Sequence, residues 1–169
     1  MKEAVIGLGS NLFDRKMNIK KSFDFIDRIL NTKIRKISKF YETKPYKVSN
    51  KQRDYINCCV SVKTELSPLV LLGACLGIEA ALGRERFCRF SSRTIDIDLI
   101  CFESFKICTE ELCLPHPRAH ERLFVLLPLF DLYPKGVPEA FCFKTFKKEI
   151  FENKDNFIKG RFSSLNDIC

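Results

Sequence analysis

Residues 93–102 read RTIDIDLICF, a run in which acidic and large apolar side chains alternate. Successive side chains of a β-strand point to opposite faces of its sheet. The odd-numbered residues from Ile95 to Cys101 are therefore predicted to share one face, and Asp96 and Asp98 to share the other. On such a strand the Cα atoms of the two aspartates lie about 6.6 to 7 Å apart, so both carboxylates can converge on a hard cation. The alternative interpretation is a solvated acidic edge of the sheet.

A second strand with the same alternation is predicted over residues 55–64. Its apolar face consists of Ile56, Cys58, Val60 and Val62. If helices cover the apolar faces of both strands, the open face of the sheet carries Asp96, Asp98, Tyr55 and Asn57 together. An amide in the middle of a strand is unfavourable unless its donors and acceptor find partners, so Asn57 favours a ligand-binding role.

Two helices and two further strands complete the predicted order. Residues 4–8 form a strand that ends in a Gly-Ser-Asn turn, and residues 34–43 form another strand. Asp14 caps the first helix, whose apolar face is predicted to consist of Ile19, Phe23, Ile26 and Leu30. The second helix begins at Ser67-Pro68, ends at Gly83 and is predicted to run through Leu72, Leu76 and Glu79.

The order strand, helix, strand, strand, helix, strand is the split βαβ arrangement of ferredoxin-like α+β folds. In that arrangement helices pack mainly on one face of an antiparallel sheet. Residues 118–133 are expected to form a C-terminal helical extension, and residues 152–169 a partly ordered surface tail. Residues 1–169 together are predicted to form a single domain.

Composition restricts the classes of protein that fit. Every apolar run is interrupted by charge, so no membrane span is expected, and the sequence after Met1 does not resemble a signal peptide. We therefore expect a cytoplasmic protein, and we interpret its nine cysteines as reduced core residues. The formal net charge of +8 favours a polyanionic partner such as a nucleotide, a nucleic acid or an acidic membrane.

The loop of residues 83–93 precedes the acidic strand and contains Arg84, Arg86, Arg89 and Arg93. Guanidinium groups facing two carboxylates that hold Mg²⁺ would form a site for a polyphosphate. The alternative is a solvated basic loop. The loop of residues 44–54 is similarly long, and long loops beside a site are often lids, although plain disorder is the alternative for both.

Several motifs in one order resemble the 6-hydroxymethyl-7,8-dihydropterin pyrophosphokinase family over about residues 4–133. They are GLGSNL at 7–12, FYET at 40–43 with Pro45, DYIN at 54–57, Glu79 with Gly83-Arg84, RTIDID at 93–98, and LPHPRAHER at 114–122 followed by Phe124. The resemblance implies an ATP-dependent transfer of diphosphate to a pterin alcohol in folate biosynthesis. This sequence departs from the family pattern at Ser91-Ser92, where Gly-Pro is usual, and at Phe90, where Trp is frequent.

The resemblance also implies roles for individual residues. Asp96 and Asp98 would hold Mg²⁺, with two ions expected, and Arg84 and Arg93 would stabilise the transferring group. The implied pterin-binding residues are Thr43, Pro45, Tyr46, Tyr55, Asn57 and Phe124. The implied ATP-binding residues are Glu79, Arg86, His116 and Arg122. By composition alone Phe124 would be a core residue, Glu79 an exposed helix acid, and His116 a histidine held by its loop.

The implied partners are small molecules, ATP and the pterin, with no nucleic acid or membrane. We expect a monomer, and association with other folate enzymes stays open. A nucleotidyltransferase is the nearest rival, since Gly9-Ser10 and Asp96-x-Asp98 echo motifs of that class, but more than eighty residues separate them. A ferredoxin-like RNA-binding module is the other rival, although no aromatic-rich RNP1-like strand occurs.

Overall fold

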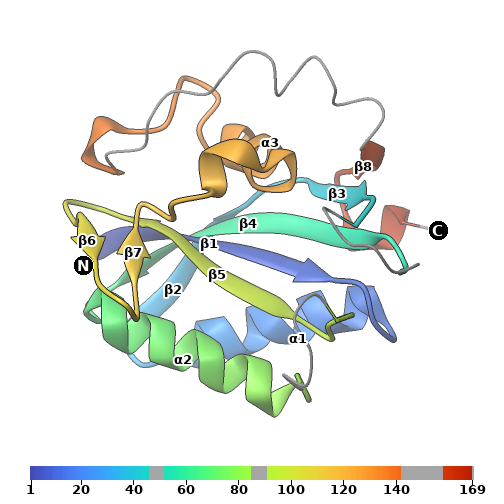
Figure 1. Cartoon of the computed structure of the whole chain (residues 1–169), viewed down its shortest axis with the longest axis horizontal. Helices are drawn as coiled ribbons and strands as arrows, with labels where there is room; N and C mark the ends of the chain where they lie inside the picture. Colours follow the sequence, from blue (N-terminus) through green and yellow to red (C-terminus); the bar gives the residue numbers. More distant parts are fainter. Residues whose placement is uncertain (46–51, 85–90, 142–157, 169) are drawn as a thin grey trace.

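Strand β1 (Lys2–Ser10) lies in the middle of the sheet, antiparallel to β4 (Tyr55–Thr64) on one side and to β5 (Asp96–Phe102) on the other. Figure 1 shows this arrangement in a computed structural model, which describes residues 1–45, 52–84, 91–141 and 158–168. The described part forms a six-stranded sheet of order β5-β1-β4-β3-β8, with β2 also paired to β4. The predicted antiparallel α+β fold is confirmed.

The predicted strand over residues 34–43 is in fact two strands, β2 (Thr32–Ile37) and β3 (Phe40–Thr43). Both pair with β4, and the ladder is interrupted between them at Ser38. The Ser38 Oγ accepts the N–H of Cys59 at 2.9 Å, while the Ser38 N–H donates to the carbonyl of Cys59 at 2.9 Å. A side-chain oxygen thus takes the place of a ladder carbonyl, which is why the strand breaks there.

Helices α1 (Arg15–Arg28) and α2 (Pro68–Ala81) cover one face of the sheet (Figure 1). Both predicted caps are confirmed, because Asp14 accepts from the N–H of Met17 and Ser67 from the N–H of Val70. The core under these helices contains the predicted apolar faces of β4 and of the first half of β5. Leu30 is an exception, since α1 ends at Arg28 and leaves it exposed.

Helix α2 runs through Leu72, Leu76 and Glu79, as predicted. Its buried residues are Pro68, Leu71, Cys75, Ile78 and Glu79. Leu76 is exposed, as are Leu69 and Val70. The helix is apolar nearly all round, so its periodicity contained little information on which side faces the sheet.

The opposite face of the sheet, which we call the α3 face, is partly covered by η1 (Ala119–Glu121) and α3 (Leu123–Leu132) (Figure 1). The prediction of an open face is therefore wrong for this half of the sheet. A second core under α3 includes Val5, Cys59, Ile100, Cys101 and Leu129. The pairing of β1 with β5 shifts register there, so an extra residue enters β5. Cys101 consequently lies on the α3 face, and the predicted alternation holds only as far as Leu99.

The remaining elements lie after β5. A small hairpin of β6 (Ile107–Cys108) and β7 (Cys113–Leu114) precedes η1, and η2 (Glu139–Phe141) follows α3. Strand β8 (Ile158–Phe162), which was not predicted, pairs with β3, and η3 (Leu165–Asp167) follows it. Among the described helices, none is both long and apolar enough to cross a membrane.

The cysteines in the described part of the chain fall into two groups. Cys58, Cys59, Cys75 and Cys101 are buried free thiols, as predicted. Cys108 and Cys113 are also free, but they lie on the β6–β7 hairpin, where Cys108 is exposed and Cys113 half-buried. The prediction of core positions is wrong for these two.

Candidate active site

Two adjoining pockets lie beside β5, the first on the α3 face of the sheet and the second at its β5 edge, next to α2. The first is lined by Gly7, Leu8, Gly9, Thr43, Lys44, Tyr55, Asn57, Cys58, Arg93, Asp96, Asp98, Ile100, Arg118, Arg122, Phe124 and Val125. The second is lined by Leu72, Leu76, Glu79, Arg84, Arg93, Asp96, Ile97, Asp98, His116 and Arg122. Both pockets share the acid pair of β5 and two arginines.

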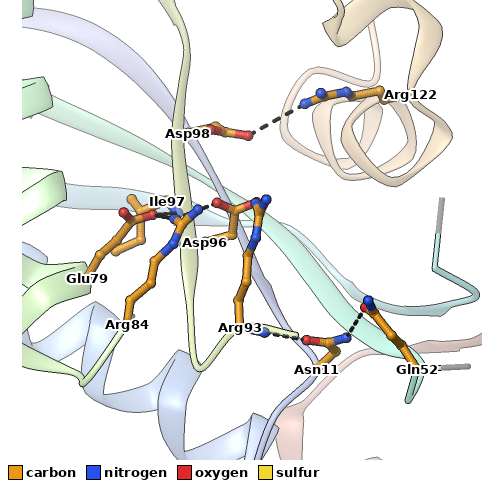
Figure 2. Close-up of polar contacts among 9 residues, drawn as sticks. All are labelled: Asn11, Gln52, Glu79, Arg84, Arg93, Asp96, Ile97, Asp98 and Arg122. Atoms are coloured by element: carbon orange, nitrogen blue, oxygen red, sulfur yellow. Dashed lines mark hydrogen bonds and ion pairs between the residues drawn. The ribbon is translucent and has the colours of Figure 1, made fainter. Parts of the chain in front are cut away.

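The acid pair lies side by side on β5 and is surrounded by guanidinium groups (Figure 2). Asp96 accepts from Arg84 at 2.6 Å through one oxygen and from Arg93 through the other. Asp98 has a looser ion pair with Arg122, 3.6 Å away. Each carboxylate of the pair thus has a cationic partner.

Asp98 has a perturbed pKa. Burial in the pocket and the neighbouring carboxylate of Asp96 raise the pKa of Asp98 to about 6, against the lowering effect of Arg122. Two like charges in one pocket oppose each other's ionisation, and a bound cation would relieve that cost. Carboxylate oxygens are ligands that Mg²⁺ prefers, and two of them suffice where phosphates and water complete the coordination. The residues present therefore fit a magnesium ion.

Glu79 lies beneath this cluster, on α2. Its carboxylate oxygen accepts the N–H of Ile97 at 2.7 Å and forms an ion pair with Arg84 (Figure 2). Only 3% of the Glu79 side chain is exposed, which excludes the alternative of an exposed helix acid. Glu79 fixes Arg84 from one side while Asp96 holds it from the other, and it also ties α2 to the backbone between the two aspartates.

Asn57 stands on β4 at the wall of the first pocket and is buried. Its Nδ2 donates to the hydroxyl of Thr43, across the β3–β4 pair, at 2.9 Å. Gly9 faces it on β1, and a Cβ atom at Gly9 would come within 2.7 Å of the Asn57 Oδ1. The glycine therefore makes room for the amide, and the threonine fixes its orientation.

The aromatic walls of the first pocket come from Tyr55 on β4 and Phe124 on α3. The guanidinium of Arg122 lies 5.7 Å from the centre of the Phe124 ring, a cation–π distance. Burial raises the pKa of Tyr55, so its phenol is neutral at neutral pH. Phe124 packs against the second core, as its apolar sequence context predicts, and it also lines the first pocket.

His116 lines the second pocket. Its Nδ1 accepts the N–H of Arg118 at 3.1 Å, and its own backbone N–H donates to Ile100 at 2.7 Å. Burial and the nearby Arg122 lower the pKa of His116 to about 4, so the ring is neutral at neutral pH. Because Nδ1 is an acceptor, the ring proton is on Nε2, where the ring can act as a donor.

Asn11, in the turn after β1, was quoted in a motif but received no role from the sequence. Its Oδ1 accepts the N–H of Arg93 at 2.7 Å, and its Nδ2 donates to Gln52 at 3.1 Å (Figure 2). The same Nδ2 is 3.3 Å from the carbonyl of Arg53. One amide therefore connects three loops that are far apart in the sequence. Its only signal in the sequence was a polar residue following Gly-Ser.

The structure brings most of the predicted residues together. The first pocket is lined by Thr43, Tyr55, Asn57 and Phe124, and the second by Glu79, Arg84 and His116. Arg93, Asp96, Asp98 and Arg122 line both. Pro45 is half-buried and lines neither pocket, and Tyr46 and Arg86 lie outside the described residues. Lys44 and Arg118 were not predicted, although Lys44 lies beside a quoted motif and Arg118 lies within one.

Comparison with known proteins gives consistent results. The sequence pattern of the family described as 7,8-dihydro-6-hydroxymethylpterin-pyrophosphokinase (HPPK) matches residues 5–134. The chain is 39% identical over 137 residues to the 2-amino-4-hydroxy-6-hydroxymethyldihydropteridine pyrophosphokinase of Bacillus subtilis, covering 81% of each chain. It is 38% identical over 129 residues to the enzyme of the same name from Haemophilus influenzae, covering 76% of this chain and 80% of that protein.

Other relatives are longer proteins. The chain is 37% identical over 135 residues to the bifunctional protein FolKE of Lactococcus lactis, which covers 80% of this chain but 38% of that protein. A crystal structure of Plasmodium falciparum HPPK-DHPS superposes with a TM-score of 0.63 at 16% identity, covering 91% of this chain and 44% of that one. The chain thus spans less than half the length of these two relatives, and the structural likeness concerns the fold alone.

Proposed function

Because the chain belongs to the 7,8-dihydro-6-hydroxymethylpterin-pyrophosphokinase family, we propose that its two adjoining pockets bind the two substrates of that family's reaction. The enzyme transfers the diphosphate of ATP to the 6-hydroxymethyl group of 6-hydroxymethyl-7,8-dihydropterin, in folate biosynthesis. The products are AMP and the diphosphate ester of the pterin. A monomer located in the cytoplasm is part of the same proposal.

The observation that carries the assignment of the pockets is their shared wall. Four of the six residues expected to bind pterin line the first pocket, three of the four expected to bind ATP line the second, and the acid pair lines both. A phosphoryl transfer requires the attacking and leaving oxygens on opposite sides of one phosphorus. A shared wall of two carboxylates and two arginines supports placing that phosphorus beside Asp96 and Asp98.

The first pocket suits a flat heterocycle with a polar edge. Tyr55 and Phe124 offer aromatic surfaces to stack on its faces, and the second Nδ2 hydrogen of Asn57 and its Oδ1 match an amide and amino edge. Thr43 orients that amide before the substrate arrives. The second pocket offers a neutral His116 donor, Arg84 and Arg122 to the nucleotide.

Asp96 and Asp98 would hold Mg²⁺. When bound there, the metal would neutralise phosphate oxygens and make the attacking hydroxyl more acidic. Arg84 and Arg93 already point at Asp96, so incoming phosphate and Asp96 compete for the same guanidinium groups. Both arginines can therefore stabilise charge on the transferring diphosphate without a large movement of the backbone.

Identification of the nucleotide product tests the proposal. The protein is mixed with Mg²⁺, ATP and the pterin alcohol, and the nucleotides are separated by chromatography. We expect AMP that appears only when the pterin is present, which distinguishes transfer from hydrolysis. ADP together with a monophosphorylated pterin would overturn the proposed transfer of a diphosphate.

A further inference from the structure

The β6–β7 hairpin places two cysteines directly opposite each other. Cys108 pairs with Cys113 across the hairpin, and Ile107 pairs with Leu114. The two thiols are both free, and Cys108 is the largest influence on the pKa of Cys113, which it raises. Neither residue lines a substrate pocket.

The hydrogen bonds of the hairpin define the type of this pair. The N–H of Thr109 donates to the carbonyl of Leu112 at 2.9 Å, so Thr109 and Leu112 are joined by a backbone hydrogen bond. Pairs alternate along an antiparallel ladder, which makes Cys108 and Cys113 a non-hydrogen-bonded pair. Cα atoms of such pairs are about 4.5 Å apart and their side chains are closest, a separation at the short end of the range that disulfides bridge.

Access separates this pair from the other described cysteines. Cys58, Cys59, Cys75 and Cys101 are buried in the two cores, and burial raises the pKa of each, so these thiols are inert toward a solute. Cys108 is exposed and Cys113 half-buried beside it. The turn between them carries Glu110 and Glu111, which would repel an anionic reagent but not a neutral one.

We propose that Cys108 and Cys113 are a modification site, a thiol pair that a small uncharged disulfide converts reversibly into a cross-strand disulfide. The exposed Cys108 thiolate attacks one sulfur of the reagent, whose sulfur–sulfur bond breaks and releases one thiol. Cys113 then attacks the mixed disulfide at Cys108 and releases the second thiol. Two protein thiols are oxidised, and one reagent disulfide is reduced to two thiols.

The test uses the folded full-length chain and bis(2-hydroxyethyl) disulfide as the neutral reagent. The reaction is stopped with acid, and the intact mass is measured directly. A portion freed of reagent is then alkylated with iodoacetamide in denaturant at mildly alkaline pH and analysed by peptide mapping. We expect a loss of two hydrogens, a peptide linked between Cys108 and Cys113, and full recovery with dithiothreitol. The matched variants Cys108→Ser and Cys113→Ser should instead retain a stable mixed disulfide at the remaining cysteine.

Three further cysteines, at positions 88, 142 and 169, lie outside the described residues. A variant with serine at these three positions is therefore treated in parallel, and peptide mapping of the wild type covers the case in which that variant does not fold. A mixed disulfide that persists at Cys108 or Cys113 in the wild type would overturn the proposal. So would two unmodified thiols, or a link from either cysteine to another position.

Discussion

Replacing Glu79 with glutamine should lower the free energy of unfolding. It should affect catalysis only because Arg84 loses a partner that holds it in place. The substitution keeps the shape of the side chain and its hydrogen bond to the N–H of Ile97, but it removes the charge opposite Arg84. Only 9% of the Arg84 side chain is exposed, and Asp96 remains as its one anionic partner in the described contacts. Removing one partner of a buried pair costs roughly 3 to 5 kcal/mol, and the remaining contact with Asp96 puts Glu79→Gln near the lower value, about 3 kcal/mol.

That loss is measurable by thermal unfolding without ligands. A loss of about 3 kcal/mol corresponds to a fall in Tm of roughly 6 to 12 °C for a chain of this size. The matched control is the double variant Glu79→Gln with Arg84→Met, which removes both charges and keeps an apolar stem. Its stability should return to within about 1 kcal/mol of the wild type, because neither position is then left with an uncompensated buried charge.

Single-turnover kinetics separates the structural effect from the chemical one. The stable double variant should still lose about 2 to 4 kcal/mol of transition-state stabilisation, because it lacks the guanidinium of Arg84. A free energy of unfolding for Glu79→Gln within about 1 kcal/mol of the wild-type value would contradict the role assigned to Glu79. So would a double variant less stable than the single one, since the two charges would then not depend on each other.

Three further predictions concern the shared wall and the first pocket. Mg²⁺ with an ATP analogue should raise the Tm of the wild type. The variants Asp96→Asn and Asp98→Asn should lose most of that rise and nearly all turnover while keeping the metal-free fold. Near wild-type Mg²⁺-dependent turnover in either variant would show that its carboxylate is not a required ligand. In calorimetry, Asn57→Leu should weaken pterin binding by about 1 to 3 kcal/mol, and Gly9→Ala should weaken it because the new methyl group contacts Asn57. Both variants should bind nucleotide with little change. Equal losses of affinity for the two ligands would indicate damage to the fold instead. The pKa of Asp98 is raised from 3.8 to about 6 by burial, so the folded protein keeps a proton that the unfolded chain releases. The stability that Asp98 contributes to the metal-free protein is therefore complete below about pH 4 and lost as the pH rises through about 6, and a pH series of melting curves should show this fall in the wild type but not in Asp98→Asn.

The alternation of side chains along β4 and the first half of β5 was sufficient to place Asp96, Asp98, Tyr55 and Asn57 on one face. It failed at Cys101, because the extra residue of β5 arises from the pairing with β1 and has no local signature. The break at Ser38 has the same origin, because it depends on the hydrogen bond between its hydroxyl and the N–H of Cys59, which the local sequence does not indicate. Local sequence therefore predicted the strands, while their irregularities depended on partners.

The candidate site shows a similar division. The carboxylates and arginines were found because acidic and basic groups close in sequence suggest a phosphate site. Asn11 was missed as a contact because its partners Gln52 and Arg93 are more than forty residues away. Glu79 was assigned to the nucleotide by resemblance, whereas its burial and its bond to Ile97 depend on how α2 packs against β5. The buried side of α2 was unpredictable for a simpler reason, because almost every residue of that helix is apolar.

Strand β8 has a consequence for how the protein behaves at high concentration. It comes from beyond residue 134, where the family match ends, and it covers the free edge of β3. Unpaired strand edges attract other chains and promote aggregation. The outward residues Lys159 and Arg161 are charged and form ion pairs with Asp54 and Asp131, so the new edge is itself protected. A chain trimmed at residue 134 would retain every residue that lines the two pockets, but it would expose the β3 edge and remove Phe141 and Ile168 from the two cores. The C-terminal segment therefore contributes to solubility and to packing without lining the pockets.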